Sequence, residues 1–490
     1  MRQSSTGSNW RVEAWVILAA AALVAVSFYL LLSALTFSLG FPLDDAWIHL
    51  TYARNLAEHG EWSFRLGERS AGSTAPLWTA LLSIGFLIGL APYVWTYLAG
   101  WAVLTLLAVC AENIARKLLP AYTARLPWAG LFFVFAWHLT WSAVSGMETL
   151  LHGLIILTVL GLLLTGSRRY LTLGLLTGLS VWVRPDGMTL LGPILFVALL
   201  SEKTWHQRRE AIWKTLIGFG SLVLPYVLFN LALSGNPMPN TFYAKQAEYG
   251  AFWHSKSFRD RLGNYLSPIL ASPFLVLIPA AAFWLVKRIR NRDWGALASF
   301  LWVVGYIAIY FVSLPAYQHG RYIIPALPVM YLWGVLGLLE MILSRQMNKR
   351  VAFVWQILTV FLCLAFTFIG ARQNANDVFW VESEMVAVAK WVNQNIPSAA
   401  RLAVHDIGAL GFYTPNPVID MAGLITPSVV SFIRDEARLA QYLDSNRVDY
   451  LISFPSFYPR LTSKRELLFQ GGLGLPPGEL GESIGVYRWR

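Results

Sequence analysis

Residues 41–60, FPLDDAWIHLTYARNLAEHG, decide how the rest of this 490-residue chain is interpreted. Two adjacent carboxylates, Asp44 and Asp45, follow directly after the first long apolar run and Pro42. A carboxylate pair at the mouth of a membrane span is costly to hold near hydrocarbon, so it is either solvated or functional. We therefore take this pair as the candidate reaction centre, in a segment that extends to Leu90.

The composition is that of an integral membrane protein. Hydrophobic residues make up 56% of the chain and charged residues only 13%, whereas about 25% of residues are charged in soluble domains. The net charge of +11 does not indicate a nucleic-acid partner, because the Lys and Arg residues fall in short loops between apolar runs, where the positive-inside rule predicts them. Cys110 and Cys363 both lie in apolar runs and are interpreted as small hydrophobic core residues.

The first apolar run, which ends at Leu39, follows Arg2 and Arg11. It is longer than the apolar part of a cleavable signal, so we expect a retained anchor with its N-terminus in the cytoplasm. The later apolar runs are roughly 93–115, 126–143, 148–165, 170–183, 187–201, 213–233, 266–286, 296–314, 322–343 and 351–370. Together they predict about 11 spans.

Basic clusters fall in every second loop between these runs, which places all of them on the cytoplasmic side. They are Arg116/Lys117/Arg125, Arg168/Arg169, Lys203/Arg208/Arg209/Lys214, Lys287/Arg288/Arg290/Arg292 and Arg345/Lys349/Arg350. This alternation holds only if the apolar segment Pro76–Leu90 does not cross the membrane. We therefore expect residues 1–370 to form the transmembrane domain, with a first extracytoplasmic loop at 40–92 that contains interfacial helices.

Residues 371–490 have the composition of a small soluble α/β domain, which this topology places outside the cytoplasm. Segments 401–406 and 448–454 resemble short buried strands. Amphipathic spacing predicts a helix over 382–396, and a Thr cap followed by Pro predicts one helix over 426–446. Alternating strands and helices indicate an α/β fold.

Two interpretations of the acidic pair stay open at this stage. In the first, Asp44 caps an amphipathic helix that lies on the membrane surface with Ile48, Tyr52 and Leu56 on one face, and Asp45 is a first-turn charge. In the second, Asp44 or Asp45 is a general base whose pKa is raised by its neighbour. His49, one turn after Asp45, is placed to orient it.

Further polar residues gather on the predicted outer side. Glu148 follows SGM, Arg184 and Asp186 lie in RPDG, Tyr243 and Lys245 lie in the predicted loop PNTFYAKQ, and His319 and Arg321 lie in QHGRYIIP. Each has a structural alternative, such as a snorkelling arginine or a turn aspartate. Their shared side is informative, because basic groups there oppose the positive-inside bias and suit an anionic ligand such as a lipid phosphate.

With these motifs assembled, nearly the whole chain resembles the GT-C superfamily of membrane glycosyltransferases, and within it the protein-mannosyltransferase-like and arabinofuranosyltransferase-like branches. The motifs are LDDAWIHLTYARNLAEHG, GSTAPLW, SGMET, RPDG, PNTFYAK, HGRYIIPALP and VHDIGALGFYTPNPVIDMAGL. The resemblance implies a bacterial inner-membrane enzyme, expected to be a monomer, that moves arabinofuranose, mannose or a similar sugar from a polyprenyl-phosphate donor to a cell-envelope glycan, lipid or protein.

The resemblance also implies roles for individual residues. The catalytic acid is Asp44 or Asp45, Glu148 matches the second outer-loop acid, and Lys245 and Arg321 are candidates for the carrier phosphate, with Tyr243 and Arg184 beside them. His49, Arg54 and His319 are supporting residues. No cofactor is expected, although Asp44, Asp45 and Glu148 could together bind Mg or Mn.

The rival interpretation is a transporter or flippase of lipid-linked saccharides. Transporters usually place ionisable groups and broken helices near the membrane midplane. In this sequence His138 and His152 are nearly the only ionisable side chains well inside the predicted spans, whereas the acids lie at the outer edges. The sequence therefore favours the transferase.

Overall fold

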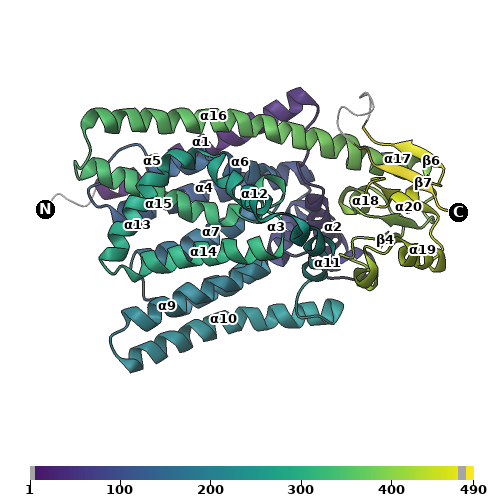
Figure 1. Ribbon diagram of the computed structural model, residues 1–490, viewed down its shortest axis with the longest axis horizontal. Helices are drawn as coiled ribbons and strands as arrows, with labels where there is room; N and C mark the ends of the chain where they lie inside the picture. The colour runs from purple at the N-terminus through teal and green to yellow at the C-terminus, as the bar shows by residue number, and fades with distance from the viewer. Residues whose placement is uncertain (1–5, 473–481) are drawn as a thin grey trace.

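A computed structural model describes residues 6–472 and 482–490, so Arg2 lies outside the described part of the chain. Long helices run side by side along the longest axis, and the C-terminal domain covers one end of this bundle, opposite the N-terminus (Figure 1). The chain is a multi-pass α-helical membrane protein with a small α/β domain, as the sequence predicts.

The bundle is built from helices that follow one another through short loops. They are α1 (Thr6–Thr36), α4 (Pro92–Leu118), α5 (Trp128–Val134), α6 (Trp137–Val144), α7 (Thr149–Leu164), α8 (Tyr170–Val183), α9 (Leu191–Ser201), α10 (Trp205–Ser234), α12 (Phe258–Leu270), α13 (Ile278–Arg290), α14 (Trp294–Ser313), α15 (Leu327–Leu343) and α16 (Lys349–Val381). Short turns of 3-10 helix join them at η1 (Pro185–Leu190), η2 (Pro273–Leu277), η3 (Gln318–Gly320) and η4 (Ile324–Ala326).

Six described helices are long and apolar enough to cross a membrane, or seven when the pair Phe258–Leu270 and Pro273–Arg290, bent by 83°, is taken as one span. Helices such as α7 and α8 are apolar but shorter. At 1.5 Å per residue, 14 residues cover about 21 Å of a hydrocarbon core of about 30 Å. The number of crossings therefore stays a prediction.

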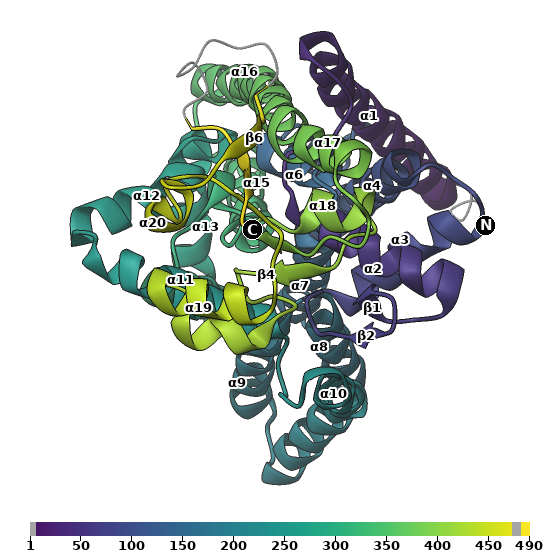
Figure 2. The same cartoon turned by 90° about the vertical axis from the view of Figure 1, so that its right-hand side faces the viewer.

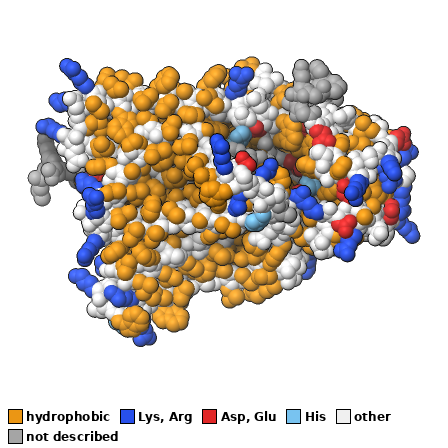
Figure 3. Space-filling view, viewed as in Figure 1, with side chains coloured by type: hydrophobic (Ala, Val, Ile, Leu, Met, Phe, Trp, Pro, Cys, Tyr) orange, Lys and Arg blue, Asp and Glu red, His pale blue; other side chains and the backbone are white. Residues whose placement is uncertain are grey.

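The surface of the bundle has the distribution of side chains expected of a membrane protein. Hydrophobic side chains cover its length. Lys and Arg line the end opposite the C-terminal domain with few acids among them, whereas over the C-terminal domain they are mixed with Asp and Glu (Figure 3). Arg116 and Lys117 end α4, and Lys287, Arg288 and Arg290 end α13. Basic side chains at a span's end are typical of its cytoplasmic side.

The first loop contains α2 (Asp45–His59), a two-stranded ribbon of β1 (Ser63–Arg65) and β2 (Glu68–Arg69), and α3 (Pro76–Leu87). At 12 residues, α3 is about 18 Å long, shorter than a hydrocarbon core of about 30 Å, and that it does not cross the membrane stays a prediction. Residues 46–53 of α2 are all buried, so this helix packs within the protein instead of exposing a polar face, and its place at the membrane surface stays a prediction. Helix α2 is enclosed by α3 on one side and the C-terminal domain on another.

Two other local predictions also need correction. The segment PNTFYAKQ, expected to be a loop, starts helix α11 (Asn240–Ser255). Residues 426–446 form two helices rather than one, η6 (Pro427–Phe432) and α19 (Glu436–Ser445). The break occurs because Asp435 caps α19, accepting hydrogen bonds from the N–H groups of Ala437 and Arg438.

The C-terminal domain continues from α16 without a break, through a π-helical turn at η5 (Glu382–Val386) and α17 (Ala387–Asn395). Its five-stranded sheet has the order β4-β3-β5-β7-β6, from β3 (Leu402–Val404), β4 (Val418–Asp420), β5 (Tyr450–Ser453), β6 (Leu467–Gln470) and β7 (Gly485–Arg488), with α18 (Gly408–Tyr413) and α20 (Pro459–Thr462) between strands. Strand β3 pairs in parallel with both β4 and β5. In such sheets, ligands bind at the carboxyl ends of the strands, where the strand order reverses.

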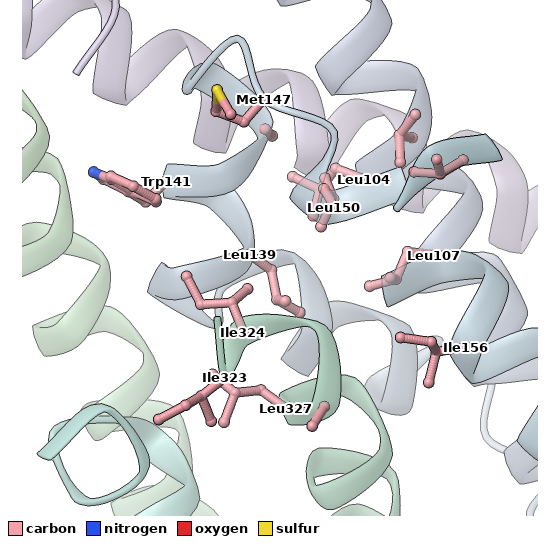
Figure 4. Packing of buried hydrophobic residues seen from close by; sticks show 14 of the residues in the cluster. Leu104, Leu107, Leu139, Trp141, Met147, Leu150, Ile156, Ile323, Ile324 and Leu327 are labelled. Carbon is pink, nitrogen blue, oxygen red and sulfur yellow. The ribbon is translucent and has the colours of Figure 1, made fainter. Parts of the chain in front are cut away.

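A buried hydrophobic core holds the helices of the bundle together (Figure 4). Four helices contribute to this core: Leu104 and Leu107 come from α4, Leu139 from α6, Leu150 and Ile156 from α7, and Leu327 from α15. These side chains pack with Met147, Ile323 and Ile324. Met147 directly precedes Glu148, and Ile323 follows Arg321 by two residues. The core therefore sets the positions of two predicted site residues.

Candidate active site

A cavity of about 570 Å³ lies between the bundle and the C-terminal domain. Asp44, Asp45, Lys245, His319 and Arg321, all predicted as site residues, line it together. The C-terminal domain forms its remaining wall with residues that follow the parallel strands β3, β4 and β5. Seen from the C-terminal domain, this sheet lies over the centre of the bundle (Figure 2).

Asp45 holds the two cations predicted to bind a phosphate. Its Oδ2 atom accepts a hydrogen bond from Arg321 Nη2 at 2.7 Å and lies 3.4 Å from Lys245 Nζ. Arg321 also donates to the side chain of Gln318, while its Nε atom has no partner among the described residues. Three chain segments thus meet at Asp45. The Nε–H group of Arg321 is still able to donate a hydrogen bond to a ligand.

The backbone before Arg321 is held in an unusual conformation. Tyr317 and His319 have positive φ angles of 52° and 58°, and Gly320 has a φ of 80°. Non-glycine residues rarely adopt positive φ, and such strain clusters at ligand sites. His319 is fixed there by Asp377, whose Oδ2 atom lies 2.7 Å from His319 Nε2.

Asp44 does not cap its own helix, contrary to the simpler of the two interpretations. Its Oδ2 atom accepts a hydrogen bond from Gly408 N at 2.7 Å, and its Oδ1 atom accepts one from Ala409 N at 2.8 Å. These donors belong to α18, so the C-terminal domain fixes the orientation of this carboxylate. A carboxylate oxygen has two lone pairs, so each oxygen keeps one acceptor site.

The environments of the two aspartates push their pKa values apart. Burial and the neighbouring Asp406 raise the pKa of Asp44 to about 7, although the Ala409 and Gly408 N–H groups oppose this. Burial would also raise the pKa of Asp45, but Lys245 and Arg321 hold it well below its usual range. Asp44 therefore has the pKa that suits a general base near neutral pH.

Three residues that the sequence did not single out complete the cavity: Glu248, His405 and Asp406. His405 Nε2 lies 3.1 Å from Glu248 Oε1, and its Nδ1 atom lies 2.9 Å from the hydroxyl of Tyr458. Asp406 Oδ2 is buried and has no hydrogen-bond partner in the described part of the chain. The available signal was a His-Asp pair that lies at the end of the predicted strand of residues 401–406 and directly follows the observed strand β3.

His49, Glu148 and Arg184 form a separate buried network instead of lining the cavity. Glu148 Oε1 accepts a hydrogen bond from Arg184 Nη1 at 2.7 Å, and its Oε2 atom lies 3.3 Å from His49 Nε2. The expectation that His49 orients Asp45 is wrong, because its Nδ1 atom faces the hydroxyls of Ser73 and Thr79 instead. Arg184 is also paired with Asp186, at 3.3 Å.

Two more predicted site residues lie elsewhere. Arg54 donates a hydrogen bond to the carbonyl of Phe412 at 2.7 Å and lies over its ring, so it attaches α2 to the C-terminal domain. Tyr243 packs against Phe242 on α11 and does not line the cavity. The phosphate candidates that line the cavity are therefore Lys245 and Arg321, without Tyr243 and Arg184.

The metal alternative is not supported by the geometry of its proposed ligands. Among the described residues, no three His, Cys, Asp or Glu side chains are grouped in a way that could hold an ion. Glu148 is turned away to Arg184 and His49, while Asp44 and Asp45 each have other partners.

The fold is the GT-C fold of multi-pass membrane glycosyltransferases. Over 99% of the chain it matches the crystal structure of ArnT from Cupriavidus metallidurans bound to undecaprenyl phosphate, with a TM-score of 0.62, 16% identity and 98% of that chain covered. It also matches the oligosaccharyltransferase of Archaeoglobus fulgidus over 92% of this chain and 70% of that one, with a TM-score of 0.62 and 12% identity.

Arabinofuranosyltransferases are similar over part of their length. The mycobacterial AftD structure matches 96% of this chain and 39% of its own, with a TM-score of 0.51 and 16% identity. The curated terminal beta-(1->2)-arabinofuranosyltransferase of Mycobacterium tuberculosis is 29% identical over 270 residues, which are 50% of this chain and 41% of that protein. A family described as a domain of unknown function, DUF8728, matches residues 373–479.

Proposed function

We propose that this chain is an inverting glycosyltransferase that moves a sugar from a polyprenyl-phosphate donor to a hydroxyl group of an acceptor. The single observation that carries the proposal is that one cavity is lined by Asp44, a carboxylate with a pKa of about 7, and by the cations Lys245 and Arg321. A base and a pair of phosphate-binding cations are the two elements that this displacement needs.

The donor phosphate binds to Lys245 and Arg321. Both cations are held by Asp45 in the free protein, and the unused Nε donor of Arg321 gives the phosphate an additional hydrogen bond. A phosphate leaving group carries its own negative charge, so it needs electrostatic stabilisation more than protonation. The charge of Asp45 keeps the two cations together before the donor arrives.

Asp44 takes the proton of the acceptor hydroxyl. The acceptor oxygen forms a bond to the anomeric carbon, the bond between that carbon and the phosphate oxygen breaks, and polyprenyl phosphate leaves with the electron pair. One displacement inverts the anomeric configuration. The N–H groups of Gly408 and Ala409 hold the carboxylate in place while it accepts the proton.

The reaction takes place on the outer face of the cytoplasmic membrane, with the N-terminus in the cytoplasm and the C-terminal domain outside. The gathering of Lys and Arg at the opposite end of the bundle supports this orientation. Arabinofuranose is the first sugar to test, because the curated arabinofuranosyltransferase matches half of the chain. Mannose is the second, and the acceptor is a glycan, lipid or protein of the cell envelope.

The test is sugar transfer by the full chain purified in detergent, with radiolabelled polyprenyl-phosphate arabinofuranose or mannose and cell-envelope extract as the acceptor. We expect labelled product from the wild-type protein and none from Asp44→Asn, which still binds the donor. No transfer by wild-type protein from either donor would contradict the proposal. Transport between compartments, the rival function, cannot produce a covalent product in detergent.

A further inference from the structure

We infer that the wall of the cavity formed by α11 and the C-terminal domain binds an uncharged carbohydrate acceptor, with Asp406 accepting hydrogen bonds from its hydroxyl groups. This inference rests on the proposed function and adds the class of acceptor to it. We call this wall, consisting of Glu248, His405, Asp406, Phe454 and Phe457, the acceptor wall.

The first observation is the carboxylate of Asp406. It follows β3 at the carboxyl end of two parallel strand pairs, which is where α/β sheets bind ligands. Its Oδ2 atom is buried without a hydrogen-bond partner among the described residues. Leaving a buried polar atom unpaired costs about 1–3 kcal/mol, so a ligand hydroxyl that donates to this oxygen removes a cost already present in the free protein.

The second observation is that the groups beside Asp406 are held rigidly. His405 is 7% exposed and bridges Glu248 of α11 and Tyr458 of the C-terminal domain. Burial would lower the pKa of His405, but the bond to Glu248 and the charge of Asp406 raise it to about 9. The imidazolium therefore satisfies Glu248 and leaves Asp406 as the carboxylate available to a ligand.

The third observation is an exposed aromatic ring in the same wall. Phe457 is 49% exposed and packs its ring edge against His405, with centroids 4.8 Å apart. An exposed ring beside polar groups that converge on a cavity is typical of a ligand site. Sugars have both a face of C–H groups and a rim of hydroxyls, and this wall offers a partner for each.

The distribution of charge specifies an uncharged acceptor. The two cations proposed to bind the donor phosphate, Lys245 of α11 and Arg321 after η3, are both paired with Asp45. The acceptor wall carries two acidic side chains, Glu248 and Asp406, and one positive charge, that of His405. Asp44, a further acid, lines the same cavity. A second anion is repelled there, so the site discriminates against acceptors that carry carboxylate or phosphate groups near the reacting hydroxyl.

The test uses the full chain in detergent at pH 8, the donor that supports transfer, and two trisaccharide acceptors. One is neutral, made of arabinofuranose or mannose, and the other ends in a uronic acid at its non-reducing end. We expect the wild-type protein to use only the neutral acceptor. Asp406→Asn should raise the acceptor KM at least tenfold while the donor KM stays unchanged. It should also reduce the ratio between the transfer rates to the neutral and to the uronic acid acceptor.

Phe457→Ala provides a second variant, because an exposed ring is dispensable for folding; it should also raise the acceptor KM alone. The matched control is Glu466→Gln, an exposed acid of the same domain that pairs with Arg488 and does not line the cavity. Transfer to the uronic acid as fast as to the neutral sugar, or an unchanged acceptor KM in both variants, would overturn the inference. Absence of any transfer by wild-type protein would instead refute the proposed function.

Discussion

Asp45 and Arg321 lie 276 positions apart in the sequence, and their Oδ2 and Nη2 atoms lie 2.7 Å apart in the cavity. The contact joins the first loop to the segment before α15. Because Lys245 of α11 reaches the same carboxylate oxygen, Asp45 holds together the two cations that we propose to bind the donor. This arrangement has consequences for donor binding that can be measured.

Substitution of Arg321 by Gln should reduce kcat/KM for the polyprenyl-phosphate donor by about 10²- to 10³-fold, the usual cost of one lost donor to a developing anion. The measurement is initial-rate kinetics with varied donor. Arg292→Gln, in the loop between α13 and α14, is the control and should leave the kinetics unchanged. Full activity of Arg321→Gln would remove this residue from the phosphate site.

Gly408→Ala should displace the carboxylate of Asp44, the proposed general base. A Cβ atom on Gly408 would overlap the carbonyl oxygen of Asp44 and lie 2.6 Å from its Oδ2 atom. Displacing a reacting group by about 1 Å can cost about 10²-fold in rate. We expect a loss of that order in kcat together with a lower melting temperature, because the carbonyl is part of the backbone and cannot rotate away, and neither change for Gly263→Ala, whose added Cβ meets nothing within 4 Å.

The sequence predicted residues that line the cavity from the side of the bundle, but neither those of the C-terminal domain nor how the two sides are joined. Hydropathy identified the bundle, and motif order identified Asp44, Asp45, Lys245 and Arg321, because these signals are local. The partners of Asp44 lie 364 and 365 positions away and are backbone N–H groups, which leave no mark in the residue type. Capping by the local helix was therefore the natural local explanation of Asp44.

Errors about the supporting residues have a similar origin. His49 lies one turn after Asp45, yet it faces Glu148, which comes from a distant span. Helical spacing gives the face of a helix, but it does not reveal that α3 and the C-terminal domain cover both sides of α2. The same limit explains why Asp406 was overlooked: a His-Asp pair after a strand is informative only when the sheet is known to face the cavity.

Removal of divalent cations should leave activity unchanged. Glu148 is bound to Arg184 and His49, so the three acids proposed as metal ligands do not share a site. The measurement is sugar transfer by protein dialysed against excess EDTA, with and without added Mg²⁺ or Mn²⁺. Loss of activity with EDTA and recovery with either ion would show that donor binding rearranges these acids into a metal site.

The ion pair of His405 and Glu248 should make the free energy of unfolding fall as the pH becomes alkaline. The pKa of His405 is raised to about 9 in the folded protein, compared with about 6.5 in an unfolded chain. The raised pKa of His405 contributes about 3 kcal/mol at most to the free energy of unfolding. This contribution is fully present below pH 6.5 and is lost as the pH rises through 9. The melting temperature should fall over this range, and much less so in Glu248→Gln. His59→Gln, at an exposed histidine, should behave like the wild type.

The pKa of Asp44 predicts the acidic limb of the pH–rate profile. A general base acts in its ionised form, so kcat/KM should fall about tenfold per pH unit below about 7.

The pKa of Asp44 is set in part by its neighbours: Asp406 and Asp45 raise it, and the N–H groups of Ala409 and Gly408 lower it. Removing the charge of Asp406 makes the ionised form of Asp44 more favourable, so Asp406→Asn should shift the limb to lower pH. Glu466→Gln should leave the limb in place, since this side chain lies outside the cavity. A limb that stays at pH 7 in Asp406→Asn would mean that Asp44 is not the group that titrates.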